Sequence, residues 1–192
     1  MSARLVLLGP PGAGKGTQAA RISERLGVPA ISTGDIFRAN VAEQTELGRR
    51  AQRYMDAGEY VPDEVTNAMV AGRLAADDAA DGFLLDGYPR TPDQVRQLDG
   101  MLESAGTGLT AVVEITADVE EAVARMLKRA AEQGRADDNE AVIRRRLEVY
   151  AEQTAPLAAT YADRGLLVRV DGMGAIDAVT DRIMAALAPR LH

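Results

Sequence analysis

Residues 5–17 read Leu-Val-Leu-Leu-Gly-Pro-Pro-Gly-Ala-Gly-Lys-Gly-Thr, a short apolar run followed by a glycine-rich turn that carries one lysine. The apolar run predicts a buried strand of a parallel sheet, and the amphipathic stretch 17–26 predicts the helix that follows it. Glycines let successive backbone N–H groups point at an anion, the helix N-terminus adds its dipole, and Lys15 supplies a cation. This order of strand, loop and helix predicts a phosphate-binding loop.

The loop departs from the general pattern G-x-x-x-x-G-K-[ST] at one position. Gly9, Gly14 and Lys15 match it, but Gly16 occupies the hydroxyl position and Thr17 follows one residue later. In the usual pattern that hydroxyl ligates Mg²⁺, so we expect this loop to hold the metal mainly through nucleotide oxygens and water. An ordinary glycine-rich turn is the alternative, and the strand and helix on either side favour phosphate binding.

Composition restricts the class of protein. A length of 192 residues with 46% apolar content fits one globular α/β unit, and a net charge of -7 argues against a nucleic-acid or anionic-membrane partner. The absence of cysteine excludes disulfides and thiolate metal sites such as structural zinc. Without a signal-peptide pattern or a long apolar run, we expect a cytoplasmic protein. The only histidine is His192, which argues against histidine catalysis.

Five apolar segments predict strands at 5–8, 28–31, 83–86, 109–115 and 166–170. Because they alternate with helical patterns, we expect an open five-stranded parallel sheet flanked by helices. The helical pattern from 36 to 74 is interrupted at Gly48, Gly58 and 61–63, which favours several short helices in an insert over the sheet edge. One long helix is expected over 139–163, kinked at Pro156, with Arg146 partly buried and Arg145 in solvent.

Charged and polar residues follow the predicted strands, at the sheet edge where ligands bind in this fold class. Lys15 follows the first strand, Thr33 and Asp35 the second, and Asp86 and Arg90 the third. Two apolar residues precede Asp86, the pattern of a carboxylate that orders Mg²⁺ or its water beside a phosphate loop. The alternative for Asp86 is a buried carboxylate that caps a turn.

Arginines form a second group near strand ends and around the 131–138 loop. Their planar guanidinium groups can hold a phosphate at two points. No side chain resembles a nucleophile, so the pattern favours direct phosphoryl transfer between two bound substrates over a phosphoenzyme. The arginines are Arg38, Arg90, Arg125, Arg129, Arg135, Arg144, Arg145 and Arg146.

Over essentially its whole length the chain resembles the adenylate kinases of the nucleoside monophosphate kinase family. The resemblance lies in the loop at 9–17, Ile-Ser-Thr-Gly-Asp-Ile-Phe-Arg at 31–38, Asp-Ala-Gly-Glu-Tyr-Val at 56–61, and Leu-Asp-Gly-Tyr-Pro-Arg at 85–90 with Gln94. It implies a P-loop NTPase fold with a core domain of 1–31, 62–128 and 139–192. It also implies a helical NMP-binding insert at 32–61 and a lid at 129–138, which is short and has no metal-binding knuckle.

The resemblance implies reversible, Mg²⁺-dependent transfer from ATP to AMP that gives two ADP, by a monomer that maintains adenine nucleotide balance. Asp86 would lie near the Mg²⁺, and no zinc is expected. The implied catalytic residues are Lys15, Arg90, Arg129, Arg135, Arg146, Asp137 and Asp138, the two aspartates anchoring the lid. The implied ATP-binding residues are Gly12, Ala13, Gly14, Lys15, Gly16, Thr17, Arg129 and Gly174. The implied AMP-binding residues are Thr33, Arg38, Glu59, Tyr60, Val61, Gly87, Tyr88, Pro89, Arg90, Gln94, Arg135 and Arg146.

Two alternatives remain at this point. Short lids also resemble the UMP/CMP kinases, but that family typically has alanine where this chain has Thr33, whose hydroxyl can hydrogen-bond a purine. A capping role for Thr33 stays open. The second alternative is a P-loop regulator that binds nucleotide without turnover. Such a protein needs no second anion site, so Arg38, Arg90, Arg135 and Arg146 argue against it.

Overall fold

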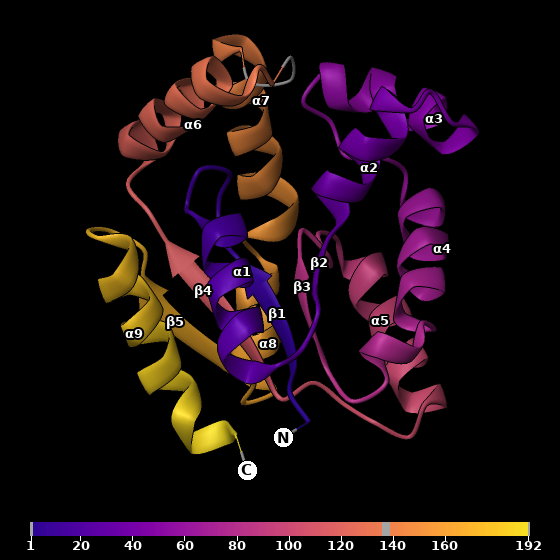
Figure 1. The fold of residues 1–192 in the computed structure, drawn as a ribbon, viewed down its shortest axis with the longest axis vertical. Coiled ribbons are helices and arrows are strands. Elements are labelled where there is room, and N and C mark those ends of the chain that lie inside the picture. The colour runs from indigo at the N-terminus through magenta and orange to yellow at the C-terminus, as the bar shows by residue number, and fades with distance from the viewer. Residues whose placement is uncertain (1, 136–138, 192) are drawn as a thin grey trace.

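A computed structural model describes residues 2–135 and 139–191 of the chain. Its centre is a parallel sheet with strand order β2-β3-β1-β4-β5, in which Leu5 of the central strand pairs with Leu84 on one side and Ala111 on the other (Figure 1). The predicted five-stranded parallel sheet is therefore confirmed. The strands are β1 (Arg4–Leu8), β2 (Ala30–Ser32), β3 (Phe83–Asp86), β4 (Ala111–Thr116) and β5 (Leu167–Asp171).

Helices connect the strands. Several begin at a residue whose side chain accepts a hydrogen bond from the backbone N–H three residues later, which satisfies a free donor of the first turn; these N-caps are Ser32, Thr45, Thr91, Asp118 and Asn139. The α-helices are α1 (Lys15–Leu26), α2 (Thr33–Ala42), α3 (Glu46–Asp56), α4 (Asp63–Leu74), α5 (Pro92–Ser104), α6 (Val119–Gln133), α7 (Glu140–Val149), α8 (Leu157–Asp163) and α9 (Ile176–Leu187). Short 3-10 turns occupy Asp77–Ala79 and Ala188–Arg190.

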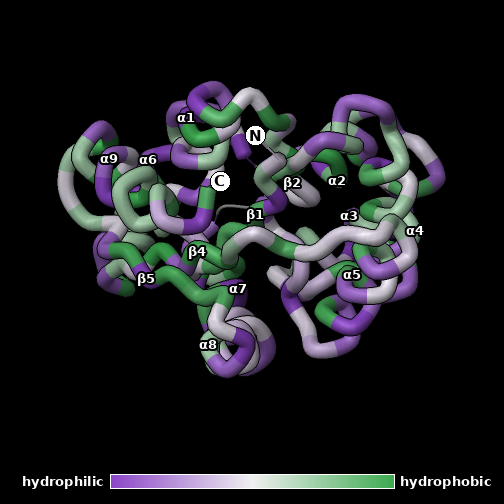
Figure 2. The backbone as a smooth tube through the Cα atoms, turned by 90° about the horizontal axis from the view of Figure 1, so that it is seen from below, coloured by the Kyte–Doolittle hydropathy of each residue, from purple (hydrophilic) through white to green (hydrophobic). Residues whose placement is uncertain are grey.

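The sheet is buried between two helical layers. On one face, Ile22 of α1 and Ile183 of α9 pack against Leu5 and Leu7. On the other face, helices α4, α5 and α8 pack against the sheet, with Leu98 and Tyr161 fully buried beside Leu85. The hydrophobic strands run through the middle of the molecule in Figure 2. This burial on both faces explains why β1 and β3 read as continuous apolar runs.

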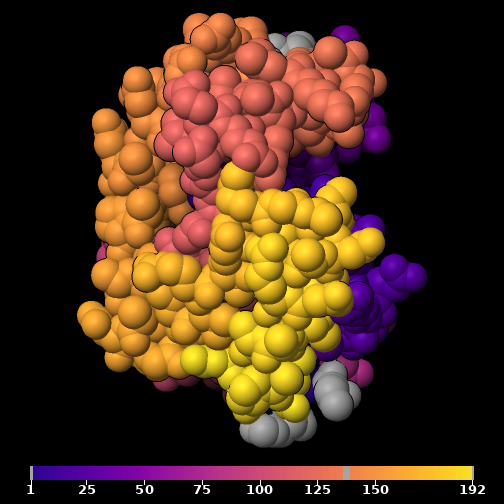
Figure 3. Space-filling model, turned by 90° about the vertical axis from the view of Figure 1, so that its left-hand side faces the viewer, coloured from indigo at the N-terminus to yellow at the C-terminus, as the bar shows by residue number. Residues whose placement is uncertain are grey.

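Four helices extend beyond the carboxyl ends of the strands. Helices α2 and α3 lie over one side of that edge, and α6 and α7 over the other (Figure 1). Figure 3 shows the second side, where α6 lies above α9. The phosphate loop lies below and between these two pairs, so they frame the sheet edge where the ligand site was predicted. Within the described residues, no helix combines the length and apolarity needed to cross a membrane.

The segment 139–163 is not one helix with a simple kink. It divides into α7, a π-helical turn at Tyr150–Thr154 and α8, and Ala155 donates its N–H to the carbonyl of Tyr150 at 2.9 Å. Pro156 has no N–H and its ring would collide with the carbonyl four residues earlier, so the chain widens before it. The sequence placed the irregularity at Pro156 correctly, but the irregularity is a π-helical turn and not a simple kink.

Gly48 does not interrupt the helical insert as expected. It lies inside α3, and the break falls before Glu46. A Cβ atom at Gly48 would stand 2.1 Å from the carbonyl oxygen of Asn40 in α2. Glycine at this position therefore permits the close approach of two helices.

Candidate active site

The phosphate loop is formed by residues 9–14, between β1 and α1. A Cβ atom at Gly12 would lie 2.5 Å from the carbonyl oxygen of Ala122, so the loop passes too close to α6 for any side chain there. Gly14 is the N-cap of α1 with φ 92°, and no side chain caps the helix. The first N–H groups of α1 are thus left for a bound anion.

Lys15 is the first residue of α1. Its Nζ donates to the carbonyl oxygens of Gly9 at 2.8 Å and Pro10 at 3.1 Å, which holds the ammonium beside the loop. The pKa of Lys15 is lowered to about 8, mainly by burial and also by the charges of Arg90 and Arg146, while Asp86 acts in the opposite direction. Burial of the charged ammonium therefore destabilises the folded protein, and a bound anion would reduce this destabilisation.

Asp86 ends β3 beside the phosphate loop and is 9% exposed. Its Oδ2 lies 3.8 Å from the position that a Cβ atom of Gly16 would occupy. The glycine in the hydroxyl position thus leaves space between the start of α1 and the only acidic side chain of β3.

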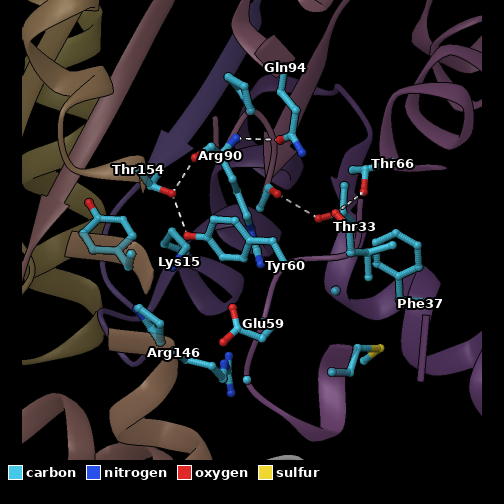
Figure 4. A pocket seen from close by; sticks show the side chains of 18 of the residues that line it. Lys15, Thr33, Phe37, Glu59, Tyr60, Thr66, Arg90, Gln94, Arg146 and Thr154 are labelled. Atoms are coloured by element: carbon cyan, nitrogen blue, oxygen red, sulfur yellow. Dashed lines mark hydrogen bonds between the residues drawn. The ribbon is translucent and has the colours of Figure 1, made fainter. Parts of the chain in front are cut away.

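A first pocket, here called the inner pocket, opens between the sheet edge, the insert and α7 (Figure 4). It brings together most of the residues predicted for AMP. Tyr88 is an exception, because its ring is fully buried and its hydroxyl donates to Asn67 at 2.7 Å. The predicted residues that line the inner pocket are Lys15, Thr33, Arg38, Glu59, Tyr60, Val61, Gly87, Pro89, Arg90, Gln94 and Arg146.

Arg90 is held from three sides in the inner pocket. Its backbone N–H donates to Gln94 Oε1 at 2.7 Å, and its carbonyl accepts from Thr154 Oγ1 at 2.7 Å. Its guanidinium lies over the ring of Tyr60, 5.0 Å from the ring centre. The Tyr60 hydroxyl lies 2.6 Å from Thr154 Oγ1, and this contact is drawn as a dashed line in Figure 4. Because Thr154 uses its one hydrogen on the Arg90 carbonyl, Tyr60 is the donor of that last bond.

Thr154 was missed by the sequence analysis. It is buried, at 3% exposure, in the π-helical turn, and its partners are 64 and 94 residues away along the chain. A threonine within a helical pattern carries no local sign of such partners. The one available signal was the nearby Pro156, which marks an irregular backbone.

Arg145 is partly exposed, as expected for the solvent side of α7, but it also pairs with the insert. Its Nε donates to Glu59 Oε1 at 2.6 Å, and both side chains are somewhat over one third exposed. The backbone of the insert comes close to α7 here, since a Cβ atom at Gly58 would lie 2.9 Å from the carbonyl oxygen of Val142. Helical periodicity assigned Arg145 to the solvent side correctly, but it could not show that the insert covers part of that side.

Arg38 and Arg135 approach the inner pocket from different elements. Arg38 pairs with Asp35 one turn earlier in α2, at 2.6 Å. Burial acts to raise the pKa of Asp35, but Arg38, helped by the charge of Arg135, lowers it overall. Arg135 does not line the inner pocket, and its Nε donates to Gln133 at 3.1 Å. The predicted lid anchors Asp137 and Asp138 lie outside the described residues.

A second pocket, here called the outer pocket, lies on the other side of the phosphate loop, between α6 and the loop after β5. Arg125 closes part of it, with its guanidinium 3.4 Å from the carbonyl oxygen of Gly172. Of the residues predicted for ATP, Lys15 lines the inner pocket and Gly16 lines neither. The others line the outer pocket: Gly12, Ala13, Gly14, Thr17, Arg129 and Gly174.

Two pockets with cationic linings thus flank one phosphate loop at the carboxyl edge of a parallel sheet. This fold and site define a P-loop nucleotide kinase, an enzyme of the nucleoside monophosphate kinase class.

The family model described as adenylate kinase matches residues 7–166, and the chain belongs to that family. A protein of Kocuria rhizophila named adenylate kinase is 68% identical over 184 residues, covering 96% of this chain and 98% of the relative. Adenylate kinases of Nocardioides sp. and Thermobifida fusca are 62% and 57% identical, covering 96% and 97% of this chain and 96% and 99% of their own lengths. The prediction of an adenylate kinase is confirmed, and neither alternative is favoured.

Proposed function

We propose that AMP binds in the inner pocket, that ATP binds in the outer pocket, and that the terminal phosphoryl group passes directly between them over the phosphate loop. The observation that carries this assignment is the position of the loop. Its Lys15 lines the inner pocket, whereas its backbone at 12–14 lines the outer one. Two nucleotides bound on either side would meet with their phosphates at the loop.

Charge neutralisation is the chemistry that these pockets can supply. Transfer of a phosphoryl group spreads negative charge over its oxygens, so fixed cations stabilise the transition state more than the separate substrates. Lys15, Arg90 and Arg146 line the inner pocket on the side of the phosphate loop and α7. We assign them to the transferring group, with Arg129 on the ATP side and Arg135 at the edge of the lid.

Thr33 supports adenine as the base in the inner pocket. Its hydroxyl donates to the carbonyl of Gly87 at 3.0 Å and is buried, so only its lone pairs remain for a ligand. Adenine carries an exocyclic amine that can donate to this oxygen, as cytosine does, whereas uracil carries a carbonyl at the corresponding place, so the hydroxyl favours an amino base over uracil. The capping role is taken by Ser32, which accepts from the N–H of Asp35 at 3.2 Å.

The residues present fit a nucleotide-bound Mg²⁺. This ion usually keeps several waters and binds through one or two carboxylates and substrate phosphates. Asp86 supplies one carboxylate beside the loop, and the described residues include no cluster of three or more acidic or histidine side chains that would hold a metal alone. Bound Mg²⁺ would neutralise phosphate oxygens of ATP, and Asp86 would hold the water around it.

Closure of the insert at 32–61 and of the lid at 129–138 over the core would exclude water, which otherwise competes as acceptor. Contacts of the insert with α7 and the π-helical turn support this role: Glu59 pairs with Arg145, and Tyr60 bonds Thr154. Both pockets are formed by residues of one chain, so we propose that the monomer is sufficient for activity.

The test measures ADP formation from ATP and Mg²⁺ with AMP, CMP or UMP as acceptor. We expect turnover with AMP, weakened in Thr33→Ala and largely restored in Thr33→Ser, which keeps the hydroxyl. A Thr45→Ala variant is the matched control, because Thr45 caps α3 and does not line the inner pocket. Preference for CMP or UMP would contradict the assignment of adenine, and no turnover with any acceptor would contradict the kinase mechanism.

A further inference from the structure

Gln94 lies in the first turn of α5 with its side chain 1% exposed and its amide at the wall of the inner pocket. The amide has two neighbours from different parts of the chain. Its Oε1 accepts from the backbone N–H of Arg90 at 2.7 Å, a bond drawn in Figure 4. Its Nε2 donates to Asp63 Oδ1 at 2.8 Å.

These two neighbours allow only one orientation of the amide. A backbone N–H can only donate, and a carboxylate can only accept. If the Gln94 amide turned over, its NH₂ would face the N–H of Arg90 and its oxygen would face the carboxylate of Asp63. Both hydrogen bonds would be replaced by repulsive contacts, so the orientation follows from the polarity of the neighbours.

Asp63 is itself held in place. It is the first residue of α4, where the helix dipole favours a negative charge. Its Oδ2 accepts from Thr91 Oγ1 at 3.0 Å, and the same Thr91 oxygen accepts from the backbone N–H of Gln94 at 3.2 Å. The carboxylate therefore connects the start of α4 with the start of α5, and its second oxygen stays on the Gln94 amide.

The bonds to Arg90 and Asp63 leave the Gln94 amide with one N–H and one lone pair for a ligand. Because the orientation of the amide is fixed, the positions of its free N–H donor and its free lone-pair acceptor are fixed as well. The base-pairing edge of adenine offers a donor at its 6-amino group and an acceptor at N1. Hypoxanthine has the same ring shape but the reverse order, with an acceptor at O6 and a donor at N1. An amide that cannot turn over matches one of these purines and opposes the other.

We propose that Asp63 is a specificity-determining positioning residue, which together with the N–H of Arg90 holds the Gln94 amide in the orientation that accepts a 6-aminopurine and rejects a 6-oxopurine. The inference rests on the proposed binding of AMP in the inner pocket. Asp63 acts through Gln94 and does not line the pocket. Base selection thus depends in part on a carboxylate on α4, outside the pocket.

The test compares AMP with IMP as acceptor at saturating ATP and Mg²⁺. Asp63→Asn has the same shape but can either donate or accept, so it removes one of the two contacts that oppose a turned-over Gln94 amide and leaves only the N–H of Arg90 against it. We expect the ratio of kcat/KM for AMP to that for IMP to fall at least about tenfold, mainly through the KM values. Glu64→Gln is the matched control: it removes a charge from the next, exposed residue of the same helical turn and should keep the wild-type ratio.

A merely structural role for Asp63 gives a different result. In that case Asp63→Asn would lower kcat/KM for AMP and IMP by the same factor, and an unchanged ratio in the folded variant would overturn the proposal. If Asp63→Asn fails to fold, Asp63→Ser, whose hydroxyl also donates or accepts, carries the same expectation. Wild-type protein that turns over IMP as well as AMP would overturn the inference alone, whereas wild-type protein inactive with AMP would overturn the proposed function as well.

Discussion

The lowered pKa of Lys15 predicts that the nucleotide-free enzyme becomes more stable as the pH rises above about 8. In the unfolded chain this lysine has its ordinary pKa of 10.5. Between the two values the unfolded state binds more protons than the folded state, so the free energy of unfolding increases with pH. The cost of burying the ammonium is fully present below the folded pKa and is lost as the lysine deprotonates.

The size of this effect follows from the two pKa values. A difference from 10.5 to about 8 corresponds to about 3 kcal/mol when the whole range is crossed. From about pH 7.5 to about pH 9.5, the part realised is about 2 kcal/mol. Tyrosines contribute in the opposite direction near and above their ordinary pKa of 10.0, because burial raises the pKa of Tyr88, Tyr150 and Tyr161. The range from about pH 7.5 to about pH 9.5 lies below the ordinary pKa of tyrosine, so the contribution of these tyrosines to the change in the free energy of unfolding is small.

The assay is urea unfolding of wild type and Lys15→Met without nucleotide, at several pH values across that range. Lys15→Met lacks the titrating group, so the wild type should gain about 2 kcal/mol relative to it as the pH rises. Lys128→Met is the control, because the Lys128 side chain is 77% exposed in a helical ion pair with Glu132. If the free energies of unfolding of wild type and Lys15→Met change in parallel with pH, the reasoning that burial of the Lys15 ammonium destabilises the folded protein is refuted.

Two further predictions concern packing and the Arg90 network. Gly48→Ala should destabilise the protein by about 2 kcal/mol or more, because the new Cβ atom would overlap the Asn40 carbonyl, whereas Gly100→Ala, in open space on α5, should stabilise it by about 0.5–1 kcal/mol. Equal effects in urea unfolding would show that the contact between α2 and α3 relaxes without cost. Thr154→Val should cost about 2 kcal/mol and lower kcat/KM for AMP, because the Tyr60 hydroxyl and the Arg90 carbonyl lose their partner. Thr154→Ser should restore both quantities, and a Thr154→Val enzyme with wild-type kcat/KM would show that Arg90 needs no such support.

The parts of the fold that were predictable depend on neighbours in sequence. The loop around Lys15 was recognisable because strand, glycines, lysine and helix must follow one another, and the N-caps Thr91 and Asp118 act on residues three positions away. The parallel sheet followed from the alternation of apolar strands with helices. Each of these signals lies within one or two elements of the chain.

What the sequence did not reveal depends on contacts between distant segments. Arg145 meets Glu59 across 86 positions, Gln94 meets Asp63 across 31, and Thr154 joins residues from two loops distant in the sequence. A polar residue with such partners looks the same in sequence as one in solvent. Gly48 was misplaced for the same reason, because the carbonyl that requires a glycine belongs to another helix. The roles assigned to the pocket residues remain predictions.

The contrast between a net charge of -7 and cationic pockets has a consequence for how the enzyme meets anions in a crowded solution. Lys15, Arg38, Arg90 and Arg146 gather in the inner pocket, where Glu59 is the one acidic side chain among the described residues, so acids outnumber bases still more strongly over the rest of the molecule. A long polyanion meets mainly the repelling exterior, while an anion small enough to enter reaches the cations. We therefore expect the molecule to select phosphates by size before any base is recognised.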